Sequence, residues 1–383
     1  MEFVQWHEFL SNILLNNILM KIKLLLFFLF LANSIFSQSK NSEIKAYLNS
    51  LKDSDFSGTI LVAQNDSIIK QSAFGLSSIE YNVKNSIDTR FNIASITKLF
   101  TAIATLQLFE NGKLNLHKPI GTYMPDYPNE KVKRTVTVHQ LLTHTSGLNN
   151  FYVNDLNKMK NQGYELVSDF MPLFVNDTLL STPGTKYNYS GSGFVVLGLL
   201  IESVSGENYY KYVENHILKP SGMKNTSAIQ VDSVVKNKAS GYTSQFGQNN
   251  TLKKNDYYLT KASPAGFYYS TIDDLFKFSK ALRNHLLLTE ATTKLMLEPK
   301  VKGYNTHLGY GIDVDNRYNQ TIIGHSGGWY GIHCELLDFM KDNYTVVILS
   351  NIDDGGHSGA SNVADFFKGL IANKELELSL IHI

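Results

Sequence analysis

The sequence predicts an α+β protein in which one antiparallel sheet is built from both chain ends and flanked by helices. Strand-like runs occur near the start, at 58–74, and again near the end, at 310–350. Between them, at about 113–265, the pattern is mainly one of helices and long loops. The regular alternation of strands and helices that is typical of a parallel sheet is absent. We therefore expect a mostly helical region inserted into a sheet-based fold.

The first expected elements are a short helix, a hairpin and a long helix. The short helix is expected at 44–52, the strands at Gly58–Val62 and Ile68–Phe74, and the turn at 64–67. Apolar, β-branched strands around a polar turn are typical of a hairpin. The long helix should begin at Ser95, because apolar residues recur at helical spacing from there to Asn111-Gly112.

The later elements complete the sheet and its cover. Helices are expected at 138–142, 193–204, about 270–288 and 361–372, and strands at 310–314, 321–325, 332–339 and 345–350. Ser270–Asp273 has the form of a capping box, which places a helix start there. The last helix should pack on one face of the sheet, and the helical region should cover the other side.

The N-terminus has the composition of a secretory signal. Lys21 and Lys23 precede the apolar run Leu24–Ala32, which is too short to span a bilayer comfortably. Met20 is then the natural start, and we expect an exported protein, periplasmic or secreted. The alternative is an uncleaved segment that anchors the chain in the membrane.

This signal sets the expected domain boundaries. We expect residues 1–38 to comprise an upstream extension and the signal, and residues 39–374 to form a single domain. Residues 375–383 look like an unpacked tail. No repeat, linker or low-complexity stretch divides the expected domain.

Composition limits the classes of function. Of the 383 residues, 43% are hydrophobic and 18% are charged, which is typical of a globular protein. The formal net charge of +1 indicates no basic surface for nucleic acid. Cys334 is the only cysteine, so no intrachain disulfide can form. We expect no cofactor, no metal, no nucleic-acid partner and no membrane contact beyond the signal; the oligomeric state stays open.

Ser95-Ile96-Thr97-Lys98 is an S-x-x-K tetrad at the expected helix start. Residues three apart share a face of a helix, so the amine of Lys98 can lie beside the hydroxyl of Ser95. A neighbouring base is one way to activate a serine nucleophile. Taken alone, the spacing favours an N-cap serine followed by a solvated lysine.

Two glycine-rich segments could converge on the tetrad. Tyr189 lies in Tyr187–Gly193, before a helix, where its phenol could shuttle a proton if a nearby ammonium lowered its pKa. Gly324–Gly328 follows a strand, and its glycines would let a substrate approach the backbone closely. The ordinary interpretation of the first segment is a turn with packed tyrosines, and that of the second segment is a glycine-rich hairpin.

The order of these three segments resembles that of the penicillin-recognising serine hydrolases, which include class C β-lactamases, D,D-peptidases and related esterases. Similar segments are 141–148 (LLTHTSGL), 218–226 (LKPSGMKNT), 263–266 (SPAG), 270–278 and 346–351 (VVILSN). The similarity covers roughly residues 45–372, so the sequence is identified as a member of this family. The resemblance implies a β-lactamase/D,D-peptidase-like fold and a small-molecule, short peptide or peptidoglycan-derived substrate.

The resemblance also implies catalytic roles. Ser95 would be the nucleophile that the substrate acylates, Lys98 its first base partner, and Tyr189 the loop tyrosine. At its ordinary pKa, Lys98 is charged at pH 7. Either burial and neighbouring cations lower that pKa, or Lys98 stays charged and Tyr189 acts as the base. The sequence leaves both possibilities open.

The third segment would bind the substrate. By the resemblance, His325 occupies the position where many relatives have lysine, followed by Gly327. The backbone N–H groups of Ser95 and Gly328 would form the oxyanion hole. Each such donor typically contributes about 3 kcal/mol to transition-state stabilisation.

Two positions depart from the family pattern. Gly191 stands where the family loop usually has asparagine, which removes an amide that could bind a substrate amide. His325-Ser326-Gly327 replaces Lys-Thr-Gly, and a mostly neutral histidine attracts a carboxylate less. We therefore expect short-chain esters, or D-amino-acid and small peptide substrates, rather than strong β-lactam hydrolysis. The alternatives are a β-lactamase or D,D-carboxypeptidase proper, and a slow-acylating sensor or scaffold without turnover.

Two other hydrolase classes are weaker interpretations. Gly324–Gly328 also fits the G-x-S-x-G elbow of α/β-hydrolases, and Asp353 and His357 follow in triad order. That elbow requires a helix after the serine, whereas a strand is expected here. A zinc hydrolase is disfavoured because H-E-x-x-H is absent and His139 and His144 lie off a common helical face.

Overall fold

The computed structural model describes residues 19–23, 40–53, 55–154, 163–230, 232–246, 251–255, 261–353 and 359–372. Two compact units are distinguished, residues 1–50 and 51–383. In the first, residues 40–50 form a helix in which Ile44 and Leu48 are buried. Most of the expected signal, including its apolar run, and the tail 375–383 lie outside the described residues. A single domain over 39–374 stays a prediction.

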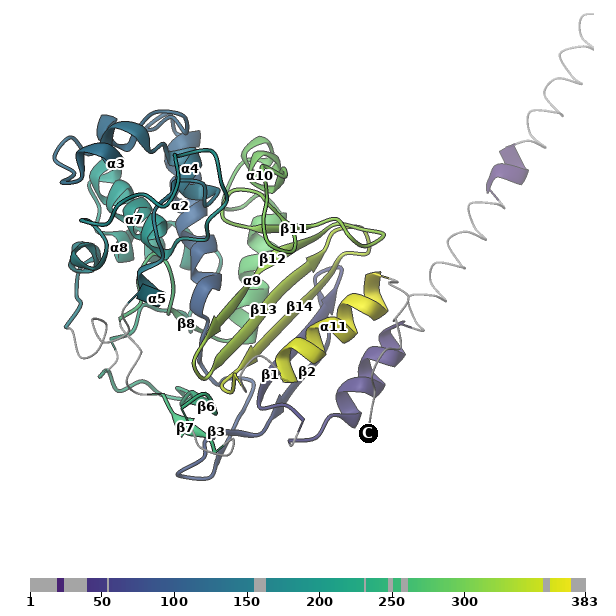
Figure 1. The fold of residues 1–383 in the computed structure, drawn as a ribbon. Coiled ribbons are helices and arrows are strands. Elements are labelled where there is room, and N and C mark those ends of the chain that lie inside the picture. Colours follow the sequence, from purple (N-terminus) through teal and green to yellow (C-terminus); the bar gives the residue numbers. More distant parts are fainter. Residues whose placement is uncertain are drawn as a thin grey trace, which may run out of the picture. The chain divides into compact units, whose positions relative to one another are not determined.

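The second unit is built on an eight-stranded antiparallel sheet with the strand order β2-β1-β14-β13-β12-β11-β10-β9 (Figure 1). Its strands are β1 Gly58–Gln64, β2 Ser67–Phe74, β9 Val301–Lys302, β10 His307–Leu308, β11 Asp313–Asp315, β12 Ile322–Trp329, β13 Ile332–Phe339 and β14 Tyr344–Ser350. β1 pairs with β14, so a strand from near the start of the chain and one from near its end lie side by side in one sheet. This confirms the predicted fold class.

The hairpin between β1 and β2 follows from its turn residues. Asn65 and Asp66 both adopt left-handed backbone angles, with φ of 48° and 62°. Two such residues make the tight turn whose twist matches that of paired strands, and Asn and Asp tolerate it best after glycine. The polar turn predicted at 64–67 is therefore the two-residue loop of this hairpin.

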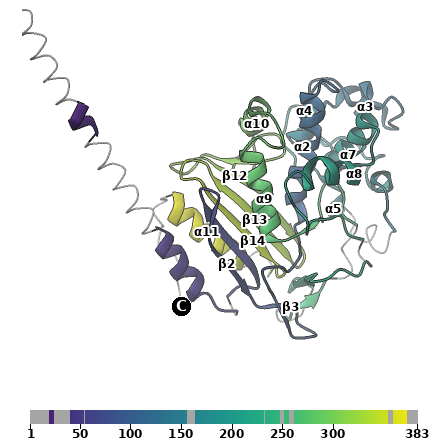
Figure 2. The same ribbon diagram turned by 180° about the vertical axis from the view of Figure 1, so that it is seen from behind.

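Helices cover both faces of the sheet. α11, Gly359–Ala372, lies on one face against β13 and β14, and α9, Ile272–Arg283, lies on the other face against β1 and β14 (Figures 1 and 2). Every residue of β14 is buried as a result. A strand that is covered on both faces needs apolar residues without alternation, which explains the run Val346–Leu349.

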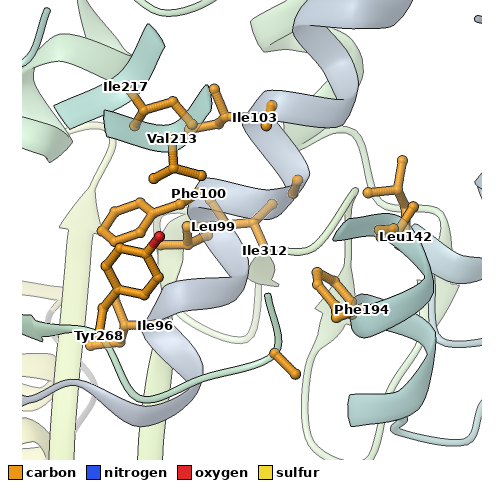
Figure 3. Close-up of a cluster of buried hydrophobic side chains, with 14 of the residues drawn as sticks. Ile96, Leu99, Phe100, Ile103, Leu142, Phe194, Val213, Ile217, Tyr268 and Ile312 are labelled. Carbon is orange, nitrogen blue, oxygen red and sulfur yellow. The ribbon is translucent and has the colours of Figure 1, made fainter. Parts of the chain in front are cut away.

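The helical region packs around α2, Thr97–Glu110, which lies against α7, Gly191–Ser205. The other α-helices that the structure describes in this unit are α3 Glu130–Thr135, α4 Val138–Leu142, α5 Phe151–Asn154, α8 Tyr209–Val213 and α10 Glu290–Leu297, and 3-10 or π segments lie at η2 Ile120–Thr122, η3 Val167–Leu173 and η4 Glu214–Leu218. The short strand pairs are β3 Leu76–Ser78 with β4 Val83–Lys84, β5 Phe91–Asn92 with β8 Tyr269–Ser270, and β6 Tyr242–Thr243 with β7 Lys253–Lys254. Figure 3 shows α2 in the core, with Phe100 beside Tyr268 on one side and Phe194 on the other. No described helix has both the length and the apolar character that a membrane crossing needs.

Several predicted boundaries were wrong by a few residues, and three of these differences have a clear physical reason. α9 ends at Arg283 instead of about 288, because His285 adopts a left-handed φ of 57° that a helix cannot continue. The strand expected from 310 begins only at Asp313, since the Gly311 N–H donates to the carbonyl of Leu142 outside the sheet. β12 continues past residue 325 to Trp329, so the glycine-rich segment is part of a strand.

Candidate active site

Ser95 lies on a sharp turn between β5 and α2. The turn is a short 3-10 segment, Ala94–Ile96, and Ala94 has a left-handed φ of 39°. That angle is uncommon for a residue with a Cβ, and it persists here because the Ala94 N–H donates to Asn92 Oδ1 and its carbonyl accepts from the Phe267 N–H. The turn brings Ser95 to the wall of a cavity of about 520 Å³.

Lys98 lies one turn after Ser95 and is fully buried. Its Nζ is 3.0 Å from Ser95 Oγ and also donates to the carbonyl of Ala265. Burial without a carboxylate partner disfavours the charged ammonium and lowers the pKa of Lys98 from 10.5 to about 7. An appreciable fraction of neutral amine is therefore present beside the serine at neutral pH.

Tyr189 lies in the loop before α7 and lines the same cavity. Its ring centroid is 4.9 Å from Lys98 Nζ. Burial raises the pKa of the Tyr189 phenol well above 10, although a hydrogen bond with Ser95 opposes that change. Tyr189 therefore holds its proton at neutral pH, which makes it a donor and relay in the resting site and leaves Lys98 as the better base.

His144 is a site residue that sequence reasoning did not assign to the site. Its ring stacks on Tyr189 at a centroid distance of 4.4 Å, and its Nδ1 accepts from the Ser190 N–H at 3.0 Å. Burial is the main cause that holds the pKa of His144 well below 6.5, and the positive charge of a protonated Lys98 lowers it further. A neutral His144 thus fixes the orientation of the tyrosine loop, and its place in the LLTHTSGL segment was the signal available in the sequence.

β12 forms the opposite wall of the cavity. β11 pairs with β12 only as far as Gly324, so no described strand covers that edge of β12 beyond this point. His325 Nδ1 lies against the Ser326 carbonyl, which can only accept, so this nitrogen carries the proton and Nε2 is an acceptor. Burial and the charge of Lys98 lower the pKa of His325 to about 4. The histidine is neutral at pH 7, as the sequence led us to expect.

The two glycines after Ser326 differ in their surroundings. A Cβ on Gly327 would lie 2.4 Å from the carbonyl oxygen of Ile93, so glycine alone lets β12 pack against the turn that carries the nucleophile. Gly328 lines the cavity, and a Cβ there would meet nothing within 4 Å. Both predicted oxyanion donors, Ser95 and Gly328, thus belong to residues that line one cavity.

The space that a side chain at position 191 would need is filled by residues of another segment. A Cβ on Gly191 would lie 2.8 Å from Asn150 Oδ1 and 2.8 Å from the ring of Tyr152. Asn150 Oδ1 accepts from the Gly191 N–H at 3.2 Å, so the Asn150 amide occupies the space next to the loop. Sequence reasoning missed Asn150, because it comes from a segment about forty positions earlier that only the tertiary fold brings here.

The competing hydrolase interpretations do not fit these surroundings. Ser326 is within β12, which leads through a tight turn into β13, whereas an α/β-hydrolase elbow requires a helix after the serine. His357 lies outside the described residues. His139 contacts Tyr310 at 2.9 Å while His144 contacts the tyrosine loop. Within the described ranges, no group of three or more histidine, cysteine or carboxylate residues is placed to hold a metal.

The antiparallel sheet, its helical cover and the S-x-x-K turn beside the β12 edge define a serine hydrolase that needs no catalytic histidine. A model described as Beta-lactamase matches residues 50–365. The chain belongs to the β-lactamase family of serine hydrolases. This confirms the family that the sequence resemblance indicated.

Relatives and solved structures agree with this family. PbpX of Bacillus subtilis (strain 168) is 31% identical over 324 residues, covering 84% of this chain and 77% of that protein. Protein flp of Staphylococcus aureus (strain N315) is 27% identical over 303 residues, which are 77% of this chain and 59% of flp. The chain therefore spans little more than half the length of flp.

Two solved structures illustrate the range of the fold. A penicillin-binding protein from Bacillus halodurans superposes with a TM-score of 0.74 at 30% identity, covering 82% of this chain and 97% of that one. The D-amino acid amidase from Ochrobactrum anthropi SV3 gives a TM-score of 0.74 at 21% identity, covering 86% and 99%. At that lower identity the similarity is one of fold.

Proposed function

We propose that this chain hydrolyses small esters and amides through an acyl-enzyme on Ser95. One observation carries the proposal: the buried Lys98 Nζ lies 3.0 Å from Ser95 Oγ at the wall of a cavity that Tyr189 also lines. A neutral amine at this distance can take the serine proton as Oγ attacks a carbonyl carbon.

The remaining groups can complete both half-reactions. The oxyanion formed by the attack would accept hydrogen bonds from the backbone N–H groups of Ser95 and Gly328. The proton taken by Lys98 would pass through the Tyr189 hydroxyl to the leaving alcohol or amine as its bond to the acyl carbon breaks. Water would then attack the acyl-enzyme, losing its proton to the same relay and releasing the acid and Ser95.

The neutral His325 supports a substrate class without a carboxylate beside the scissile bond. With a pKa of about 4, this side chain provides no fixed positive charge at pH 7. We infer that short-chain esters and D-amino-acid amides or small peptides are better substrates than cephalosporins or D-Ala-D-Ala. The fold shared with a D-amino acid amidase is compatible with this inference.

A substrate panel and intact-mass spectrometry test the proposal together. We expect p-nitrophenyl acetate and D-amino-acid amides to be turned over faster than a cephalosporin or D-Ala-D-Ala. Fluorophosphonate should add one adduct, lost in Ser95→Ala and retained in the matched variant Ser326→Ala. Loss of activity in Ser326→Ala alone would refute the nucleophile assignment. A permanent penicillin adduct without turnover of any substrate would instead identify a sensor.

A further inference from the structure

Two tyrosine side chains form an uncharged part of the wall of the catalytic cavity, and neither has a role in the proposed chemistry. Tyr187 and Tyr304 both line the cavity that Ser95 lines. Their rings lie 5.0 Å apart and meet edge to face, with an angle of 80° between the ring planes. Ligand pockets are typically lined by aromatic and apolar side chains with a few polar groups, so a pair of rings at this place can contact a substrate.

Tyr187 is held beside the proposed proton relay. It precedes Tyr189 by two residues, and both of these tyrosines line the cavity. Asn188, which lies between them, is not part of the cavity wall, and its Nδ2 donates to the carbonyl of Leu148 at 3.0 Å. The Tyr187 ring also meets the ring of His144 edge to face at a centroid distance of 6.1 Å, and His144 stacks on Tyr189. The loop that positions the relay therefore positions Tyr187 as well.

Tyr304 comes from the loop between the two outermost strands of the sheet. Residues 303–306 join β9 to β10, and the Gly303 N–H donates to the carbonyl of Thr306 at 2.8 Å, which closes the loop. β10 pairs with β11, and β11 pairs with β12, so the loop belongs to the sheet whose β12 strand carries the opposite wall. Tyr304, Asn305 and Thr306 all line the cavity.

Tyr304 is 75% exposed although it lies at the cavity. Within the described part of the chain, its ring has no aromatic partner besides Tyr187, and its hydroxyl forms no hydrogen bond. A single exposed aromatic residue is ordinary on a protein surface. At the cavity of the nucleophile, however, its open surface is available to a substrate group, and covering it would contribute to binding.

The charged side chains of the cavity wall belong to other segments. They lie on β11, in the segment after β11, on β13 and on α11, and are Asp313, Asp315, Arg317, Glu335 and Lys368. Arg317 is held by Asp315 through hydrogen bonds of 2.9 and 2.8 Å. Tyrosine is uncharged at neutral pH, so the part of the wall formed by Tyr187 and Tyr304 can bind an apolar ring without removing water from an ion.

We propose that Tyr187 and Tyr304 form an aromatic subsite of the catalytic cavity, which binds an aryl group of the substrate. The inference rests on the proposed function and narrows it to esters and amides that carry an aromatic ring close to the scissile bond. The substrate ring packs on the exposed surface of Tyr304, while the Tyr187 ring supports Tyr304 from the side of the tyrosine loop. Aromatic rings favour offset or edge-to-face packing, and both arrangements are open to a ring beside Tyr304.

Three esters that differ by one phenyl group test the subsite. Benzyl acetate and methyl phenylacetate each replace one hydrogen of methyl acetate by a phenyl ring, on the leaving side and on the acyl side of the scissile bond. We expect kcat/KM, measured from acid release at constant pH, to be about tenfold higher for at least one aryl ester than for methyl acetate. Tyr304→Ala should lower kcat/KM for that ester by about fivefold or more and leave that for methyl acetate unchanged, and Tyr304→Phe should keep the aryl preference.

Tyr81→Ala is the matched control. Tyr81 is 81% exposed and lies between β3 and β4, away from the cavity wall, so its removal should change neither the aryl preference nor the rate with methyl acetate. The melting temperature of Tyr304→Ala should equal that of the unmodified protein, because Tyr304 is mostly exposed. A clear fall in melting temperature would assign Tyr304 a structural role instead.

Each other outcome has a defined meaning. Equal kcat/KM for the three esters, an aryl preference that survives Tyr304→Ala, or a parallel loss of methyl acetate hydrolysis in that variant would overturn the inference while leaving ester hydrolysis established. If p-nitrophenyl acetate is hydrolysed but the three esters are not, the same comparison applies to their inhibition constants against p-nitrophenyl acetate. Absence of hydrolysis of all four esters would count against the proposed function instead.

Discussion

Protonation of Lys98 should switch off acylation of Ser95 as the pH falls through about 7. Nζ must be neutral to accept the serine proton, and burial lowers the pKa of Lys98 from 10.5 to about 7. A lowered lysine pKa means that the charged form predominates only below that value. The acylation rate should therefore rise with pH and level off above about pH 8.

The magnitude follows from the two pKa values. At 10.5, only about one lysine in 3,000 is neutral at pH 7, whereas at about 7 roughly half are neutral. Burial thus enriches the active form by about 1,500-fold, which corresponds to roughly 4 kcal/mol. At about pH 5.5 the neutral fraction is roughly 3%, so acylation should be about 30-fold slower than on the plateau.

Single-turnover acylation by p-nitrophenyl acetate, followed by stopped flow from about pH 5 to 10, measures this dependence. Circular dichroism at each pH checks that the protein stays folded. Lys98→Arg, which keeps a permanent charge, should acylate slowly at every pH. A profile that is flat between about pH 5.5 and 8.5 would refute the role of Lys98. An acylation rate that still rises at about pH 10 without reaching a plateau would identify Tyr189 as the base, since burial raises its pKa.

Three further predictions concern packing, charge and helix capping. Gly327→Ala should lower both kcat and the melting temperature, because its Cβ would lie 2.4 Å from the Ile93 carbonyl and overpacking costs about 1–3 kcal/mol. In the control variant Gly328→Ala the added Cβ points into open space, so the melting temperature should stay unchanged. Equal melting temperatures for the two variants would contradict this packing. His325→Lys should raise the ratio of kcat/KM for a cephalosporin to kcat/KM for p-nitrophenyl acetate by about tenfold, since a cation would attract the cephalosporin carboxylate. An unchanged ratio would show that the charge at position 325 does not set specificity. Thr271→Ala should cost about 1 kcal/mol in urea unfolding, because its side chain caps α9, and Thr271→Ser should restore most of it.

Much of the fold was predictable because its signals are local. The polar turn at Asn65-Asp66, the helix α4 and the strand β13 were each anticipated from residues within or beside the element. The length of β12 was not, because a glycine-rich segment has little strand propensity of its own. Pairing with β13 through Trp329 supplies the hydrogen bonds that keep it extended.

The sequence by itself determined the family and the identity of the S-x-x-K pair, since both depend on residue order. Only the tertiary structure decided what these residues can do. The pKa of Lys98 depends on burial by segments such as Ala265, far away in the chain. The contacts of His144 with Tyr189, and of Asn150 with Gly191, likewise join segments about forty residues apart. Acid–base chemistry depends on distance and solvent exclusion, and neither is encoded in residue order alone.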